Sequence, residues 1–153
     1  TQAKTLFPYT TLFRSILGLL AYFEREQSRG VTSEELAESI GTNPVVVRRV
    51  LGDLKAAGLI DSRRGPGGGS VLARDAKTIT LRHAYEAVRG DHQHLLGGYT
   101  GEVSARCQVA PVIAAYLGDL YREAEEALVR RLEQVSVDEM SRDIVSRLRR
   151  APA

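Results

Sequence analysis

The residues best suited by type and position to bind a ligand are Arg48 and Arg49, which lie close to Val45 and Val46 in one short segment. An arginine can donate two hydrogen bonds to O6 and N7 of guanine, and an exposed valine can contact the methyl group of thymine. The segment therefore has the residues of a helix that reads the major groove of DNA. The alternative is a solvated helix whose valines are incidental.

The spacing of apolar residues predicts which side of this helix is buried. Four residues recur at helical spacing and should face a core: Val47, Val50, Leu51 and Leu54. The opposite side carries Val45, Arg49 and Gly52, with Val46 and Arg48 at its flanks. These five residues are therefore expected to be exposed.

Both ends of the helix are marked in the sequence. Asn43 is a good N-cap, and Pro44 suits the first helical position, where its missing N–H has no cost. Gly58 provides a left-handed stop. Because the amides at a helix N-terminus suit a phosphate, Thr42, Asn43 and Pro44 are expected at the DNA.

A shorter helix precedes this one. Thr32 or Ser33 caps it, Glu34 and Glu35 occupy its first turn, and Gly41 ends it. The two helices and their tight turn form a helix-turn-helix, and Ser33 is a further candidate DNA contact.

A hairpin is predicted after the helix-turn-helix, because two short apolar runs at 59–60 and 71–72 flank a basic, glycine-rich stretch. Arg63 and Arg64 can reach phosphates or the minor groove, while Gly67 and Gly68 let the tip approach DNA closely. A phosphate-binding loop of nucleotide enzymes is excluded, because no lysine precedes Ser70 and a strand follows. The alternative is a flexible loop with two solvated arginines.

A long helix is predicted beyond Pro111, to about Gln134, and it would span about 36 Å. Its apolar stripe consists of Ile113, Leu117, Leu120, Ala124, Leu128 and Leu132. Because so long a helix overhangs a small domain, we expect the stripe to form a symmetric dimer. Packing on its own domain is the alternative.

The fold class is therefore mainly α, a winged helix-turn-helix with a small β-hairpin wing and a long C-terminal dimerisation helix. Pro8 interrupts the helical period, so residues 1–15 are expected to be a non-native or disordered leader. Residues 16–90 would form the DNA-binding domain, residues 91–110 a sensor-type loop, and residues 111–153 the dimerisation helix and a last helix.

Composition excludes several classes of protein. The 153 residues are 43% hydrophobic and 26% charged, so a folded core is expected. No apolar run is long enough to cross a bilayer and no secretory signal is visible, which predicts a cytoplasmic protein without a membrane partner. The net charge is only +2, but residues 42–74 hold six basic and two acidic residues, as expected where DNA binds.

Several motifs together resemble one family. They include LA in the first helix, TNPVVVRRVL in the second, AGLI before the hairpin and GPGG at its tip. Over about residues 16–140 the chain resembles the Rrf-two family of bacterial winged-helix transcription regulators. The resemblance implies a homodimeric repressor of double-stranded DNA at a palindromic operator. Some relatives also hold an iron–sulfur cluster through three cysteines in the loop before the long helix.

The chain departs from the cluster-binding branch. Cys107 matches the last cysteine, but Gly101 and Leu95 stand at the other two positions. One thiolate cannot hold a cluster that takes four protein ligands, so no cofactor is expected. Cys107 is then either a redox-sensing thiol or a packed, inert one.

The other groups of polar residues give only weak evidence for a function. Asp91, His92, His94 and Glu102 with Cys107 offer a weak metal site, against which a solvated loop is the simpler interpretation. The acidic pairs Glu34-Glu35 and Glu125-Glu126 are interpreted as helix surface, and no catalytic grouping has a supporting motif, so an enzyme is not expected. The alternatives to a DNA-binding repressor are a protein-interaction module and a regulator whose 91–107 loop binds a metal or small molecule. The effector is unknown.

Overall fold

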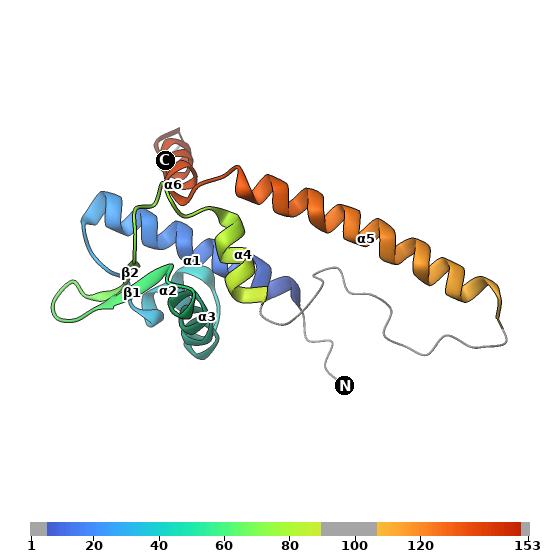
Figure 1. The fold of residues 1–153 in the computed structure, drawn as a ribbon. Coiled ribbons are helices and arrows are strands. Elements are labelled where there is room, and N and C mark those ends of the chain that lie inside the picture. The colour runs from blue at the N-terminus through green and yellow to red at the C-terminus, as the bar shows by residue number, and fades with distance from the viewer. Residues whose placement is uncertain (1–5, 90–106, 151–153) are drawn as a thin grey trace.

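The computed structural model describes residues 6–89 and 107–150, which form a mainly helical fold with one two-stranded antiparallel sheet (Figure 1). The elements are α1 (Leu6–Gln27), α2 (Ser33–Ile40), α3 (Pro44–Ala56), β1 (Ile60–Arg63), β2 (Gly69–Leu72), α4 (Leu81–Arg89), α5 (Val109–Glu133) and α6 (Val137–Arg150). The predicted fold class, a winged helix-turn-helix followed by a long helix, is confirmed.

Helix α1 is the centre of the core. Phe13, Ile16, Leu17 and Leu20 are all at most 1% exposed, and they pack with residues of α2, α3 and α4. Residues 1–15 are expected to be a non-native or disordered leader, and the structure places residues 6–15 of this segment in helix α1. Pro8 is its third residue, where a helix amide has no partner to lose.

Helices α2 and α3 begin and end at their predicted caps. Thr32 and Glu35 form a reciprocal capping box at α2, and Gly41 ends it in the left-handed conformation. Asn43 caps α3 and Pro44 is its first residue. These local hydrogen bonds fix the turn between the two helices, and so the direction in which α3 leaves the core.

The hairpin is held against the body by close backbone contacts. Strands β1 and β2 pair in the register Ile60↔Leu72 to Arg63↔Gly69, and Val31 forms an isolated bridge with Ser70. Gly69 has a φ of +122°, and a Cβ there would lie 2.6 Å from the Val31 backbone. A glycine is therefore required where the wing crosses the segment before α2.

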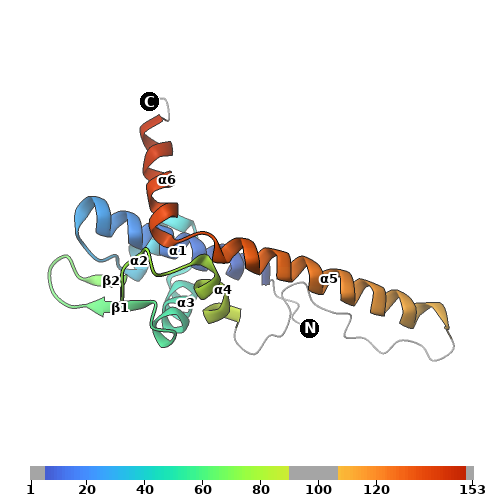
Figure 2. The same cartoon turned by 45° about the horizontal axis from the view of Figure 1, so that its top comes forward.

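Helix α4 lies against α1, α3 and α5, whereas α6 packs on α1. The approach of α6 is close at Gly18, where an added Cβ would lie 3.3 Å from the Met140 side chain. Helix α5 leaves the body and projects away from the hairpin (Figures 1 and 2). It begins at Val109, inside the predicted 91–110 loop, because Pro111 is tolerated in a first turn. Within the described ranges, no helix has the length and apolarity to span a membrane.

Candidate nucleic-acid interface

The outward face of α3 carries the residues that the helical spacing placed there. Val45 is 65% exposed and Arg49 is exposed, while Val47, Val50 and Leu54 are completely buried.

Val46, one of the expected reading residues, is less available. Val46 is only partly exposed and packs against the core, and Leu51 on the inner face is also partly buried. Thr42 and Pro44 are intermediate in exposure, whereas Asn43 is exposed. The face that can meet a groove is therefore centred on Val45 and Arg49.

Arg48 is tied to α2. Its guanidinium is ion-paired with Glu34, and its Nε donates a 3.2 Å hydrogen bond to Ser33 Oγ. Hydrogen bonds to the Glu34 carboxylate, first from Ser33 and then from Arg48, lower the pKa of Glu34. The two predicted contacts Ser33 and Arg48 are thus brought together, with an acid between them that the spacing did not reveal.

The first turn of α3 does not offer the free amides expected for a phosphate. Asn43 Oδ1 accepts from the Val45 amide at 2.8 Å, and the Val46 amide donates to the Asn43 carbonyl at 3.0 Å. The Thr42 amide donates to Ala37 at 2.9 Å. Pro44 has no amide hydrogen, so capping already uses the donors that the sequence suggested for DNA.

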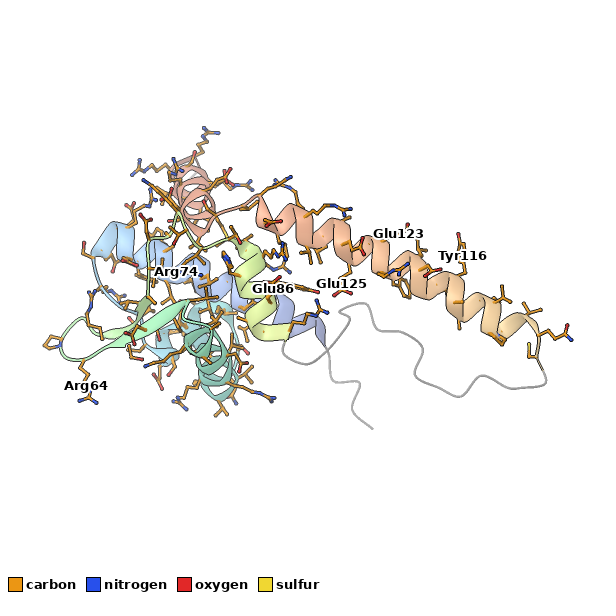
Figure 3. All side chains as sticks on the ribbon, viewed as in Figure 1. Arg64, Arg74, Glu86, Tyr116, Glu123 and Glu125 are labelled. Atoms are coloured by element: carbon orange, nitrogen blue, oxygen red, sulfur yellow. The ribbon has the colours of Figure 1, made fainter. Side chains whose placement is uncertain are left out.

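The wing carries the other basic residues. Arg63 and Arg64 are exposed, and neither has an ion pair among residues 6–89 and 107–150. Figure 3 shows Arg64 at the tip of the hairpin, with its side chain extending away from the body on the side where α3 lies. Two arginines without counter-charges, beside the exposed face of α3, are suited to bind phosphates.

The backbone geometry of the wing by itself explains why glycines occupy its tip. The Gly67 carbonyl accepts from the Gly30 amide at 2.9 Å. A Cβ at Gly68 would lie 2.4 Å from the Arg63 carbonyl oxygen, so this position excludes any side chain. Shaping of the tip explains Gly67 and Gly68 without a DNA contact.

Lys55 is a basic residue that the sequence analysis did not assign to the site. Its Nζ donates to Ser62 Oγ at 3.1 Å and lies 3.4 Å from Asp61 Oδ1, which links α3 to the wing. The pKa of Asp61 is lowered, chiefly by the Ser62 amide and then by Lys55. The sequence feature that could have drawn attention to Lys55 is its position in the last turn of a helix, where a positive charge is favourable.

The apolar stripe of α5 divides into two halves. Leu128 and Leu132 pack on the chain's own core, Leu132 at 6% exposure. Ile113, Leu117 and Leu120 remain 52%, 37% and 47% exposed. Ala124 is exposed as well, as are Val109, Val112, Tyr116 and Tyr121. Leu128 and Leu132 therefore already have partners in their own domain, and the dimer contact stays a prediction for the stripe, with its exposed part at the other four residues.

Glu125 does not lie on the helix surface, although the acidic pair Glu125-Glu126 is interpreted as helix surface from the sequence. It is 6% exposed, accepts a 2.6 Å hydrogen bond from the Tyr85 hydroxyl and lies 3.8 Å from Arg89. Burial, and then the bond to Glu125, raise the pKa of Tyr85 well above its usual range. This polar contact joins α4 to α5.

The expected sensor loop lies largely outside the described residues. This holds for Asp91, His92, His94 and Glu102, so the metal alternative is not tested. Cys107 is exposed, two residues before α5 begins. Across residues 6–89 and 107–150, no three metal-binding side chains come together.

Comparison with known proteins identifies the family. Residues 9–143 match the family model Rrf2, described as an iron-dependent transcriptional regulator. The chain is 32% identical to YwnA of Bacillus subtilis, named as an HTH-type transcriptional regulator, over 82% of this chain and 88% of YwnA.

Solved structures share the fold. IscR of T. potens has a TM-score of 0.63 at 18% identity, covering 100% of this chain and 94% of IscR. CymR of B. subtilis has a TM-score of 0.59 at 18% identity, covering 92% and 96%.

The family description names iron, whereas this chain has too few cysteines for an iron–sulfur cluster held by several cysteines. The sequence holds one cysteine, Cys107, which is exposed, and one cysteine is too few for a cluster held by several. The matched family and YwnA are regulators and not enzymes. The extent of the family match and the winged helix-turn-helix together establish that this chain belongs to the Rrf2 family of transcriptional regulators.

Proposed function

We propose that the protein is a homodimeric, sequence-specific DNA-binding repressor that acts in the cytoplasm on a palindromic operator. The observation that carries the proposal is the presence of two exposed basic features on elements that contact each other, α3 and the wing. Arg49 and Val45 stand on the outer face of α3, and Arg63 and Arg64 stand on the wing beside it.

In this proposal α3 enters the major groove. Arg49 donates to a guanine and Val45 contacts a thymine methyl, because both lie opposite the buried face. Arg48, held by Glu34, lies at the flank and contacts the DNA backbone together with Ser33. The wing arginines contact phosphates or the minor groove.

The same proposal assigns the exposed half of the α5 stripe to a second copy of the chain. Ile113, Leu117 and Leu120 form an apolar surface that monomeric proteins rarely leave in water. A symmetric pair of reading helices would match a palindrome. Repression follows where such an operator overlaps a promoter.

The test compares two arginines on an operator and on random DNA. Arg49→Ala should cost about 1 to 3 kcal/mol on the operator and much less on random DNA, because it removes a base contact. Arg64→Ala should weaken both evenly and make the salt dependence shallower by about one unit of log–log slope. Fluorescence anisotropy across a salt series measures both.

Two results would contradict the proposal. A uniform loss from Arg49→Ala would assign it to the backbone, and would pass base reading to Val45, Val46 or Arg48. Binding that ignores salt, or no binding to any genomic fragment, would favour a protein-interaction module instead.

A further inference from the structure

Arg29 is a basic residue that the proposed interface does not use. It lies in the short connection between α1 and α2, and its side chain is only 30% exposed. Its guanidinium lies over the Phe23 ring, 4.5 Å from the ring centroid, near the C-terminal end of α1. A guanidinium is attracted to the face of an aromatic ring and stacks on it. Arg29 is thus held on the last turns of α1.

The same guanidinium holds the start of α2. Its Nη1 donates to Glu35 Oε1 at 2.9 Å, and the other oxygen of that carboxylate accepts from the Thr32 amide at 2.9 Å. Its Nε donates to Gln27 Oε1 at 2.8 Å. One planar cation therefore ties the last residue of α1 to the capping box of α2, in a geometry that a lysine cannot reproduce.

The connection that carries Arg29 has little conformational preference of its own. Ser28 has a φ of +50°, in the left-handed region that residues other than glycine seldom adopt. Gly30 is free to adopt many conformations. Arg29 Nη1 also donates to the Gly30 carbonyl at 3.1 Å. The contacts of the Arg29 side chain therefore restrict a backbone that its own residues leave free.

This connection is paired with the wing. The Gly30 amide donates to the Gly67 carbonyl at 2.9 Å, and Val31 and Ser70 exchange two backbone hydrogen bonds at 3.0 and 2.8 Å. A Cβ at Gly30 would lie 3.0 Å from the carbonyl carbon and oxygen of Gly68. The two backbones are thus in close contact, so a change in the connection is transmitted to the wing.

The Gly67 contact lies where the wing is least supported by its own strands. The ladder of β1 and β2 ends at Arg63 and Gly69, and the tip that carries Arg64 lies beyond it (Figure 3). Because a two-stranded hairpin is only marginally stable by itself, its tip takes its direction from the backbone against which it packs. The direction in which Arg64 extends thus depends on the connection at Gly30.

We propose that Arg29 is a positioning residue for DNA binding, which holds the wing so that Arg63 and Arg64 reach the phosphates. This inference rests on the proposed function, because only that function assigns the wing to DNA. The rival interpretation is that Arg29 is itself a phosphate contact. Its guanidinium already has acceptors on Glu35 and Gln27, whereas Arg64 has no ion pair within residues 6–89 and 107–150. Arg64 is therefore the better placed of the two to bind a phosphate.

The first measurement uses no DNA, so its result is independent of the proposed function. Amide hydrogen exchange in the full chain, followed by NMR, reports how often the Val31 and Ser70 amides open. Arg29→Ala should speed their exchange at least tenfold more than that of Val50, which is completely buried in α3. Arg149→Ala is the control, because it removes the same charge from an exposed position on α6, and it should change none of these rates.

The second measurement is a double-mutant cycle in DNA binding. Arg29→Ala should weaken binding at least threefold, and equally on the operator and on random DNA, because phosphate contacts carry no sequence information. In a protein that already carries Arg63→Ala and Arg64→Ala, the further change Arg29→Ala should weaken binding less than twofold, since no wing arginine is left to position. A direct phosphate contact would weaken binding by the same factor in both backgrounds.

Two milder variants separate the role of the geometry from that of the charge. Arg29→Lys keeps the charge but loses the planar fork, and Phe23→Leu keeps an apolar side chain but loses the ring. Each should show part of the faster exchange and part of the loss of DNA affinity. They also provide the test if Arg29→Ala lowers the thermal midpoint too far for exchange to be measured.

Three outcomes would be decisive. Exchange at Val31 and Ser70 that stays in step with Val50 in Arg29→Ala would overturn the inference, because the connection would not then depend on Arg29. Equal losses of DNA affinity with and without the wing arginines would also overturn it, and would assign Arg29 to a phosphate. A wild type that binds no DNA would contradict the proposed function, and the exchange rates would still decide whether Arg29 holds the wing.

Discussion

At the residue scale, two glycines show how different the demands on one residue type can be. Gly69 has positive φ and a Cβ there would meet the Val31 backbone, whereas a Cβ at Gly52, in the middle of α3, would meet nothing within 4 Å. We expect Gly69→Ala to lower the free energy of unfolding by at least about 2 kcal/mol. Gly52→Ala should raise it by about 0.5 to 1 kcal/mol through helix propensity.

Urea denaturation of both variants measures the difference. A Gly69→Ala protein as stable as the wild type would mean that the wing does not pack on Val31 as the structure shows. Gly52→Ala is also a probe of the interface, because its new methyl group lies on the exposed side of α3.

The buried Tyr85 hydroxyl is a second single group on which the stability of the fold should depend. Tyr85→Phe should destabilise the fold by about 1 to 3 kcal/mol, because the buried Glu125 loses its 2.6 Å hydrogen bond. Tyr22→Phe is the matched control, since its hydroxyl makes no hydrogen bond within the described ranges, and it should change stability by less than about 0.5 kcal/mol. Equal effects in thermal unfolding would show that the hydroxyl bonded to Glu125 contributes no more to stability than a hydroxyl without such a bond.

Single residues also show where sequence reasoning stops. The exposure of Val45 and Arg49 follows from helical spacing alone. The pairing of Arg48 with Glu34 joins residues 14 apart, and that of Tyr85 with Glu125 joins residues 40 apart. Such pairs depend on how helices pack, which the periodicity of one helix does not contain.

At the element scale, the cap of α2 predicts a pH dependence. The pKa of Glu35 is lowered, chiefly because its carboxylate accepts from the Thr32 amide. A folded pKa below the unfolded one means that this stabilisation is present above the unfolded value, and is lost as pH falls through the folded one. Glu35→Gln should therefore flatten the fall in stability below about pH 5.

The control for this prediction lies on the same helix. Glu38→Gln removes an exposed carboxylate whose side chain makes no hydrogen bond or ion pair within residues 6–89 and 107–150, so the variant should lose stability in acid as the wild type does. Thermal midpoints between pH 3 and pH 7 give the comparison. A Glu35→Gln profile parallel to that of the wild type would show that the capping box does not hold in solution.

Helix boundaries are predictable wherever the sequence contains a capping residue. Thr32, Gly41, Asn43 and Gly58 bound α2 and α3 as expected. The sequence suggested that Pro8 interrupts the helical period, but Pro8 lies in the first turn of α1, where it removes no hydrogen bond and does not interrupt the helix. A proline thus has opposite meanings at positions that only the folded chain distinguishes.

At the scale of the whole molecule, α5 serves two purposes along one stripe. Its C-terminal part packs on the core through Leu132, while its N-terminal part projects into solvent (Figures 1 and 2). The period of the stripe predicted one continuous apolar face. Where that face leaves the body depends on the size of the domain beneath it, which the period does not encode.

The exposed part of α5 permits a clean test of the dimer. Leu120 is 47% exposed in the single chain, so Leu120→Glu should leave the monomer folded while placing a charge in the apolar contact between copies. The wild type should sediment near 34 kDa, about twice the chain's 16.8 kDa, and the variant should dissociate.

Ala115→Glu is the control, because Ala115 is exposed on the opposite side of α5 from the stripe, and it should remain dimeric. A wild type that is monomeric at micromolar concentration would contradict the dimer, and equal dissociation of both variants would place the contact elsewhere on α5. If the dimer holds, Leu120→Glu should also bind a single half-site as well as the wild type does, while losing the gain from the second. The second half-site increases affinity because the first raises the effective concentration of the second α3 helix at the DNA, and this requires the two α3 helices to be linked in a dimer.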